Sequence, residues 1–279
     1  MVCAGDKTKL LVISTRDLRR TRLTANDINI QVNVCGETID ESTDEKLLGV
    51  IISNNLTWRT YLYGNGKTGD EKLVGLTTKL SQRVGILSKI AKVTTSRQLA
   101  NMCQGMFTSR LIYCIQLFGN VWGLPNLDEV NRRSMSFTKE DNRKLQVLMN
   151  KTLRIRSKLG HDTPTSMLLS STNELSVHQL CAFHTLMLVF KVVTSQKPKY
   201  LSDRLELRKP IEGQIFNHRL LNTIRVPDVQ LSASKSAFFV RSASLWNMLP
   251  LVMRSGMKAV TFKRELRKWI LEQIPIKPP

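Results

Sequence analysis

Five pairs of adjacent acidic residues are the groups in this sequence that could bind a divalent metal ion. Carboxylate oxygens are the ligands that Mg²⁺ prefers, and such ions catalyse phosphoryl transfer. Each pair lies where we expect a turn or the start of a helix, and acidic side chains are favourable there because they accept hydrogen bonds from free backbone amides. We therefore predict a structural role and no metal site for Asp40-Glu41, Asp44-Glu45, Asp70-Glu71, Asp128-Glu129 and Glu140-Asp141.

Gly66-Lys67-Thr68 resembles the end of a phosphate-binding loop. That motif also requires a glycine five residues before Gly66, and Tyr61 stands there instead. We interpret the segment as a turn. The sequence therefore predicts no nucleoside triphosphate loop and no small-molecule substrate.

Cysteine and histidine are also poorly placed for metal binding. The five cysteines are widely spaced in apolar sequence, no Cys-x-x-Cys occurs, and the four histidines lie at no zinc-ligand spacing from them. This pattern is typical of reduced, buried thiols in an intracellular protein. We predict no cofactor for this chain.

The charge of the chain points to a polyanionic partner. Lys and Arg number 42 against 22 Asp and Glu, which gives a formal net charge of +20. A membrane surface fits less well than nucleic acid, because the cations are spread along the whole chain. Neither an apolar stretch of about 18 residues nor the pattern of a signal peptide is visible, so we expect an intracellular protein, nuclear or cytoplasmic, with no membrane partner.

The first 60 residues predict β-structure. Short β-branched runs at 10–14, 28–34 and 47–53 are separated by turns, one of them at Cys35-Gly36-Glu37. Residues 28–34 alternate apolar and polar side chains, which predicts one buried and one solvated face. Residues 47–53 do not alternate, which predicts one strand covered on both sides.

From Asp70 onward the apolar spacing becomes helical. Asp70 is placed to cap a helix at 70–91, and further helices are expected at 96–118, 142–159, 176–195, 234–248 and 261–273. Thr138-x-x-Asp141 predicts a capping box for the helix at 142–159, and Gly160 predicts its end. The four tryptophans lie in apolar patterns, so we expect them in the core rather than stacked on bases.

The helix at 142–159 is strongly basic. It contains no acid between Arg143 and Gly160, so its cations repel one another unless a polyanion relieves the repulsion. We predict contact with RNA here through Arg143, Lys144, Lys151, Arg154, Arg156 and Lys158.

Several sequence blocks occur in an order that resembles one family. Lys7-Thr8-Lys9 precedes LLVIS, KLLGVIISNNLTW follows at 46–58, and KLQVLMNKTLRI, ELSVHQL, FFVRSASLWNMLP and FKRELRKWIL follow at 144–155, 174–180, 238–250 and 262–271. The chain resembles the C-terminal part of the reverse transcriptase of non-LTR (LINE-type, Jockey-like) retrotransposons, which are transposable elements. Two departures are visible: Tyr61 and Leu62 stand where that family has a His-Ile pair, and no Tyr-x-Asp-Asp or Ala-Asp-Asp occurs.

The resemblance implies an α+β fold in four parts. Residues 1–62 would be the β-rich end of the polymerase palm, with the Leu-Gly-Val segment in a hairpin that grips the primer. Residues 70–122 would form a helical thumb, residues 123–137 a linker, and residues 138–279 a basic, mainly helical C-terminal region. The catalytic aspartates and their Mg²⁺ would belong to a part upstream of residue 1, so we predict no catalytic residue here.

The resemblance also suggests roles for five cations near the N-terminus. Lys72, Lys79 and Arg83 fall within about 40° of one another on a helical wheel. On a thumb helix they would lie along the wide minor groove of an RNA–DNA hybrid, and an ordinary solvated face remains the alternative. Lys7 and Lys9 match a segment in which polymerases keep a lysine near the incoming triphosphate.

The sequence therefore predicts a truncated RNA-directed DNA polymerase that contributes template and primer binding and is inactive alone, with RNA and RNA–DNA hybrid as partners. A non-catalytic or exapted basic helical interaction protein is the alternative. A third possibility is an active polymerase completed by an upstream exon.

Overall fold

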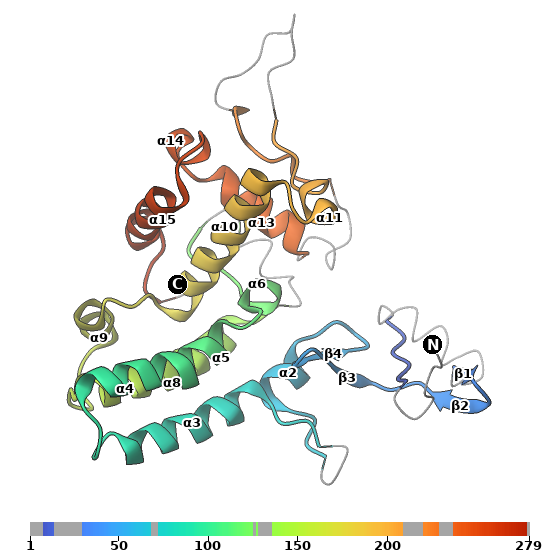
Figure 1. Cartoon of the computed structure of the whole chain (residues 1–279), viewed down its shortest axis with the longest axis horizontal. Helices are drawn as coiled ribbons and strands as arrows, with labels where there is room; N and C mark the ends of the chain where they lie inside the picture. The colour runs from blue at the N-terminus through green and yellow to red at the C-terminus, as the bar shows by residue number, and fades with distance from the viewer. Residues whose placement is uncertain are drawn as a thin grey trace, which may run out of the picture. The chain divides into compact units, whose positions relative to one another are not determined.

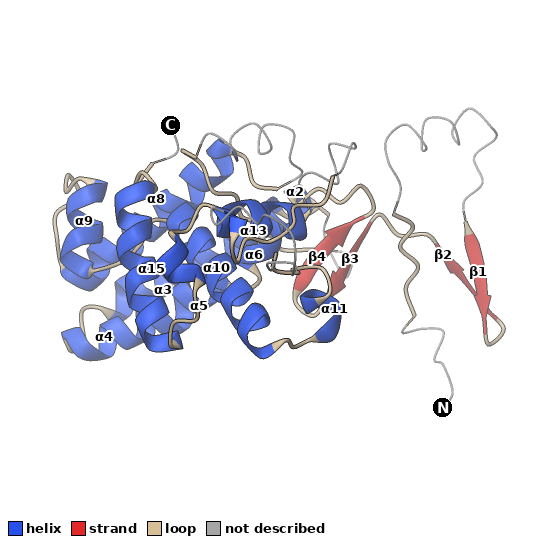
Figure 2. Ribbon diagram, turned by 90° about the horizontal axis from the view of Figure 1, so that it is seen from above, coloured by secondary structure: helices blue, strands red, loops and turns tan. Residues whose placement is uncertain are grey.

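The computed structural model describes residues 8–13, 30–67, 72–124, 127, 136–208, 220–228 and 237–277. Its class is α+β, as predicted: two small antiparallel hairpins are followed by helices (Figure 1 and Figure 2). The chain forms two compact units, Met1–Lys79 and Leu80–Pro279. The first contains the described strands, and the second contains most of the described helices.

Both hairpins close with the same two-residue turn. Strands β1 (Gln31–Val34) and β2 (Glu37–Asp40) pair around Cys35-Gly36, and β3 (Asp44–Leu47) and β4 (Val50–Ser53) pair around Leu48-Gly49. The φ angles are 52° and 86° in the first turn and 49° and 87° in the second. Positive φ at both central residues defines the type I′ turn, whose twist matches that of antiparallel strands, and glycine adopts it without steric cost.

The β-region differs from the sequence expectation in three places. Residues 47–53 are not one strand, because the Leu48-Gly49 turn divides them. The prediction that both faces of this strand are covered holds for β4, in which Val50 and Ile51 are buried. The prediction that one face of β1 is buried is wrong, since Val32 is 40% exposed. Leu10 makes only an isolated bridge to Glu41 within the described residues 8–13.

The predictions for the cysteines and for the acidic pairs also need correction. Cys103 and Cys181 are buried as predicted, but Cys35 is exposed in its turn. Asp40 and Asp44 lie in strands rather than turns, where their carboxylates accept hydrogen bonds from Gln31 Nε2 and Ser53 Oγ across each hairpin. The roles are structural, as expected, and the Asp70-Glu71 and Asp128-Glu129 pairs lie outside the described residues.

The helix expected at 70–91 begins later than predicted. Helix α2 (Arg59–Tyr63) is followed by a loop whose Val74 bridges to Gly64, and α3 (Leu76–Ile90) starts only after Gly75. A Cβ on Gly75 would lie 2.3 Å from the Tyr63 carbonyl carbon, so the backbone passes too close to α2 for another residue. Asp70 itself lies outside the described residues.

The described residues of the second unit form a run of short helices and several longer ones. The helix expected at 96–118 divides into α4 (Ser96–Met102), the π-helix η3 (Cys103–Thr108), α5 (Ser109–Ile112) and α6 (Ile115–Phe118), with Cys114 at φ 57° before α6. After these come α8 (Lys139–Ser157), α9 (Thr165–Thr172), α10 (Val177–Ser195), α11 (Lys199–Ser202), α13 (Phe238–Asn247), α14 (Leu251–Arg254) and α15 (Ala259–Gln273).

Helix α10 is the centre of this unit. It contacts α5, α6, α8, α11, α13 and α15 (Figure 1). Its side chains are buried on several faces. Phe190 of α10 stacks on Phe262 of α15 with ring centroids 4.1 Å apart, and Trp246 of α13 packs beside Phe262. Trp122, Trp246 and Trp269 are buried, as predicted, and Trp58 is half-buried.

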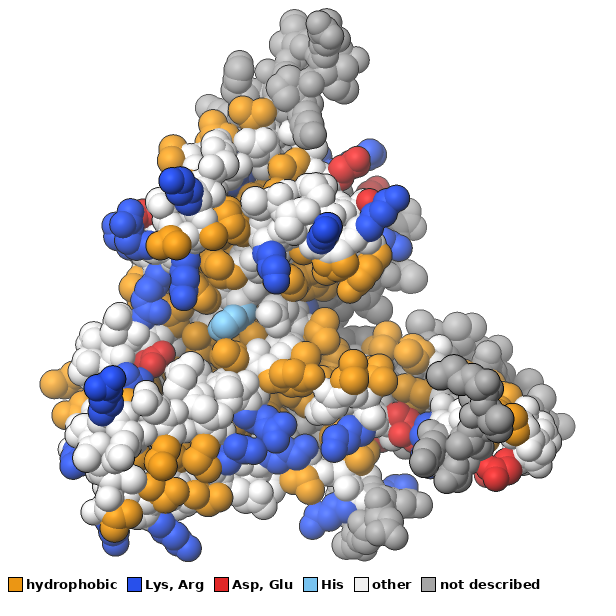
Figure 3. Space-filling model, in the orientation of Figure 1, with side chains coloured by type: hydrophobic (Ala, Val, Ile, Leu, Met, Phe, Trp, Pro, Cys, Tyr) orange, Lys and Arg blue, Asp and Glu red, His pale blue; other side chains and the backbone are white. Residues whose placement is uncertain are grey.

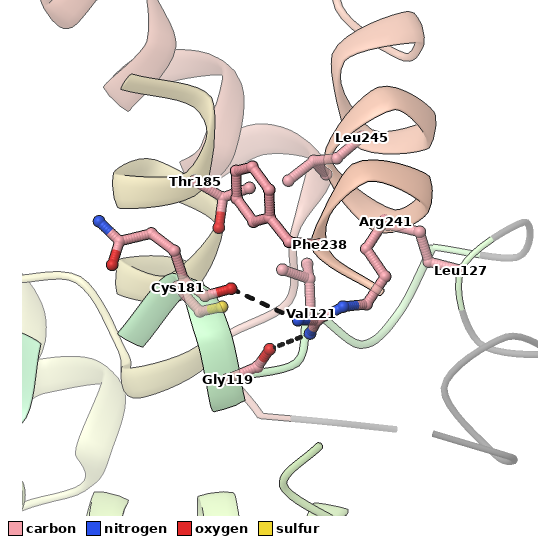
Figure 4. A pocket seen from close by; sticks show the side chains of 9 residues that line it. Gly119, Val121, Leu127, Cys181, Thr185, Phe238, Arg241 and Leu245 are labelled. Carbon is pink, nitrogen blue, oxygen red and sulfur yellow. Dashed lines mark hydrogen bonds between the residues drawn. The ribbon is translucent and has the colours of Figure 1, made fainter. Parts of the chain in front are cut away.

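Arg241 ties α13 to the end of α6 (Figure 4). Its guanidinium donates hydrogen bonds to the carbonyl oxygens of Gln116, Leu117 and Gly119 and to Asn120 Oδ1. These carbonyls belong to the last turn of α6, where a helix has unsatisfied acceptors and a partial negative charge. Burial lowers the pKa of Arg241, and the helix end compensates the buried charge without a carboxylate partner in the described residues.

We predict that Arg241→Met destabilises the protein by about 2 to 4 kcal/mol, because the carbonyls of α6 lose charged donors that few waters can replace. Urea unfolding measures the change. The matched control is Arg264→Met, since the Arg264 side chain is 68% exposed, and it should change stability by less than about 0.5 kcal/mol. Equal losses for the two variants would show that Arg241 does not hold α6.

Candidate nucleic-acid interface

Helix α8 carries most of the predicted binding residues. It begins with the predicted capping box, in which Thr138 Oγ1 accepts from the Asp141 amide and Asp141 Oδ2 accepts from the Thr138 amide. Leu145, Met149 and Leu153 are buried. The helix ends one turn before Gly160, because Lys158 adopts the left-handed conformation at φ 54° and caps it.

The three arginines of this region are bonded within the protein. Arg143 donates two hydrogen bonds to the Glu140 carboxylate, with N–O distances of 2.7 and 2.8 Å. Arg154 Nη2 donates to the Thr163 carbonyl at 2.9 Å, and Arg156 Nη1 lies 2.7 Å from Glu174 Oε1. The argument from unrelieved repulsion is therefore wrong for Arg143 and Arg156, because their carboxylate partners Glu140 and Glu174 lie outside the segment between Arg143 and Gly160. Arg154 is bonded only to a neutral carbonyl in the described residues, so the argument still applies to its charge.

The lysines of α8 remain on the surface. Lys144 and Lys151 are exposed and lie seven residues apart, within about 20° of each other around the helix. Lys158 is exposed one further heptad along, at the C-cap. We call Lys144, Lys151 and Lys158 the lysine line. In Figure 3, Lys and Arg side chains are spread widely over the visible face, and acidic side chains are few.

The cations predicted for the thumb helix do not share a helical face. Lys72 is exposed but precedes α3, so its position on a helical wheel has no meaning. Lys79 lies on α3 and is half-buried. Arg83 Nη1 donates to the Met106 carbonyl of η3 at 3.0 Å. A three-residue binding face is therefore wrong for this helix.

Of the two lysines proposed to lie near a triphosphate, the structure describes one. Lys9 is exposed beside Leu10, whereas Lys7 lies outside the described residues. Of the segment that resembles a phosphate loop, Gly66 has φ 71° and the Lys67 amide donates to Asn65 Oδ1, which is turn geometry as predicted.

A groove of about 430 Å³ runs beside the N-terminal half of α8, and the sequence did not predict it. Residues from α8, α9, the start of α10 and the C-terminal segment line it. Its outer residues are charged, and include Lys139, Glu140, Arg143 and Lys277. The Arg143 hydrogen bond lowers the pKa of Glu140, so that carboxylate is ionised at neutral pH.

A row of polar side chains lies in the groove and joins three helices. The Val177 amide of α10 donates to Gln146 Oε1 at 2.8 Å, Gln146 Nε2 donates to Asn150 Oδ1 at 2.9 Å, and Asn150 Nδ2 donates to Thr165 Oγ1 at 2.9 Å. We call Gln146, Asn150 and Thr165 the polar row. The i, i+4 spacing of Gln146 and Asn150 on α8, next to the apolar stripe, was the signal that could have pointed to these two residues.

His178 also lines the groove and is 1% exposed. Burial lowers the pKa of His178 to about 4, although a hydrogen bond with the Pro275 backbone opposes the shift. Nε2 has no hydrogen-bond partner in the described part of the chain, so the bond to Pro275 uses Nδ1. The neutral imidazole therefore presents Nε2 as an acceptor.

No group of three or more metal-binding side chains occurs in the described residues. One described helix, α10, is long and apolar enough to cross a membrane by length and composition alone, but 61% of its most apolar 18-residue window is buried within the protein, so it is weak evidence for a membrane span. Comparisons with protein-family models, with curated proteins and with solved structures gave no match.

The burial of His178 predicts a pH dependence of stability. Its folded-state pKa of about 4 lies below the ordinary value of 6.5, so the unfolded chain binds more protons between these values. Stability should be complete above about pH 6.5 and fall by on the order of 3 kcal/mol as the pH approaches 4. Urea unfolding from pH 7 to 4 measures it.

His178→Gln should remove most of this dependence, whereas Gln at the exposed His161 should leave it intact. Burial also lowers the pKa of His184, and Lys263 adds to the shift, so a smaller slope of the same sign remains. A full slope in the His178 variant would exclude His178 as its cause.

Proposed function

We propose that this chain binds nucleic acid through the lysine line of α8, as the template-binding part of a retrotransposon-type RNA-directed DNA polymerase. The proposal rests on the order of the sequence blocks and on the net charge of +20. The β3–β4 hairpin also supports it, because Leu48-Gly49 of the Leu-Gly-Val block forms its turn, where the resemblance expects a primer-gripping hairpin. RNA and RNA–DNA hybrid are the proposed partners.

The observation that carries the proposal is the line of exposed lysines. Lys144, Lys151 and Lys158 recur at heptad spacing along one side of α8 and at its C-cap. Lysine ammonium groups bind phosphates as point charges without reading sequence. Such a line suits a backbone that runs past the helix rather than one specific base.

A basic helical interaction protein with an acidic protein partner is the second candidate. The internal bonds of Arg143, Arg154 and Arg156 favour it, because they reduce the number of cations that nucleic acid could contact. An acidic protein and an RNA differ in how their binding responds to salt, since RNA releases condensed counterions.

We predict a steep salt dependence of RNA binding. If the protein makes about six phosphate contacts, affinity should fall about a thousandfold between 50 and 200 mM salt. Replacing Lys144, Lys151 and Lys158 together by alanine should reduce the slope of log affinity against log salt by about 2 to 3, because each lost contact removes roughly 0.7 to 0.9. Filter binding at several salt concentrations measures both.

The control has the same charge change at exposed lysines elsewhere in the same unit, Lys191, Lys199 and Lys258. It should lower affinity slightly and leave the slope near that of the natural protein. Equal slopes for the two triple variants would argue against the lysine line, and a slope of zero in the natural protein would argue against nucleic-acid binding.

Primer extension tests the expected lack of polymerase activity. The sequence contains no Tyr-x-Asp-Asp or Ala-Asp-Asp, so we expect no incorporation of nucleotides on a primed RNA template with Mg²⁺ or Mn²⁺. Addition of a separately expressed polymerase palm with its aspartates is the positive arm. Incorporation by the chain alone would contradict the proposal that it contributes binding without chemistry.

A further inference from the structure

The groove beside α8 combines two chemical properties that few ligands satisfy together. Lys139 and Lys277 are exposed at its edge and favour an anion there. Its interior contains the polar row and His178, which favour a neutral group with hydrogen-bond donors and acceptors. A ligand for this groove must therefore carry negative charge next to a flat polar group.

The polar row keeps unused hydrogen-bonding capacity. A side-chain amide has two N–H groups, and Gln146 and Asn150 each use one in the bonds that join the helices. Thr165 Oγ1 accepts from Asn150, so its own hydroxyl hydrogen is available as a donor within the described structure. Because the helices fix the direction of this row, its remaining donors are preorganised.

His178 supplies a hydrogen-bond acceptor that has no donor partner in the described residues. Its Nε2 is buried, and a buried polar atom without a hydrogen bond costs about 1 to 3 kcal/mol, which corresponds to roughly five- to 150-fold in a dissociation constant. The imidazole is neutral because burial lowers its pKa to about 4. Nε2 has almost no solvent-accessible surface, so a ligand N–H reaches it only when the side chains that line the groove move, and the hydrogen bond formed there would remove this cost.

A flat surface is also present at the edge of the groove. Arg143 and Glu140 are joined by two hydrogen bonds, so the guanidinium and carboxylate lie edge to edge on the surface beside the groove. Their bonds use the edge of the guanidinium, so its face remains suited to stacking. Unpaired nucleobases stack on arginine planes as well as on aromatic rings.

We propose that this groove binds one unpaired nucleotide of a single-stranded nucleic acid. The base lies on the face of the Arg143 guanidinium with its edge toward the polar row and His178, and the phosphate lies near Lys139 and Lys277. A nucleotide has the required anion next to a planar group with donors and acceptors, and a groove of about 430 Å³ is within the range for small ligands. The inference rests on the proposed function and adds a site that holds a base.

Titration of the full-length, ¹⁵N-labelled protein with 5′-AMP or 5′-CMP, followed by NMR, tests the proposal. We expect shifts of the Gln146 and Asn150 side-chain amides and of His178 Nε2, with a dissociation constant in the millimolar range. Inorganic phosphate should bind at least fivefold more weakly, because it lacks the base. Equal affinity for phosphate, or shifts confined to lysine surroundings, would overturn the proposal.

A matched pair of variants on α9 tests the polar row. Thr165→Val removes the hydroxyl in the groove and should weaken nucleotide binding about fivefold, the value of one hydrogen bond. Thr172→Val makes the same change on the same helix outside the groove and should have no effect. Equal affinities for the two variants would overturn the role of the row, and the shift mapping on the natural protein keeps the test valid if Thr165→Val unfolds.

The two proposals fail in different ways. If oligonucleotides bind with the predicted salt slope but mononucleotides do not shift the groove residues, the groove inference is wrong and the lysine line stands. If mononucleotides shift the groove residues but oligonucleotides show no salt slope, the groove inference survives and the proposed function is wrong.

Discussion

Helix α10 is apolar on most of its circumference, and this constraint organises the second unit. Such a helix must be covered on several sides, because each exposed apolar face would cost free energy in water. The cover comes from α5, α6 and α8 on the N-terminal side of the sequence and from α11, α13 and α15 on the other. Segments up to about 95 residues apart are joined in this way, as when Gln179 Nε2 donates to the Ile274 carbonyl.

The same constraint creates the groove. Helix α10 starts where the Val177 amide meets Gln146, so the first turn of α10 lies against the middle of α8. Asn150 then links α8 to α9 through Thr165. The polar groups that satisfy these helix contacts are the groups that line the groove, so residues of this surface also hold three helices together.

Arg241 shows how a buried cation is accommodated with no carboxylate partner among the residues that the structure describes. The positive charge lies at the end of α6, where carbonyl oxygens and the helix dipole give a partial negative charge. Helix α6 has only four residues, and its last turn would otherwise have unsatisfied acceptors. The long side chain of Arg241 therefore supplies the hydrogen bonds that a capping residue would give to the end of α6. It holds α13 against α6 at the same time.

The sequence by itself determined the class of the fold, the capping box of α8 and most helix positions, because these depend on local spacing and backbone chemistry. Thr138 and Asp141 are three residues apart, so their bond could be predicted directly. The tertiary structure decided which cations stay exposed, because Arg156 finds Glu174 and Arg83 finds the Met106 carbonyl only after distant segments pack. It also decided the split at Leu48-Gly49 and the groove, since turn geometry and the meeting of three helices depend on contacts that spacing along the chain does not encode.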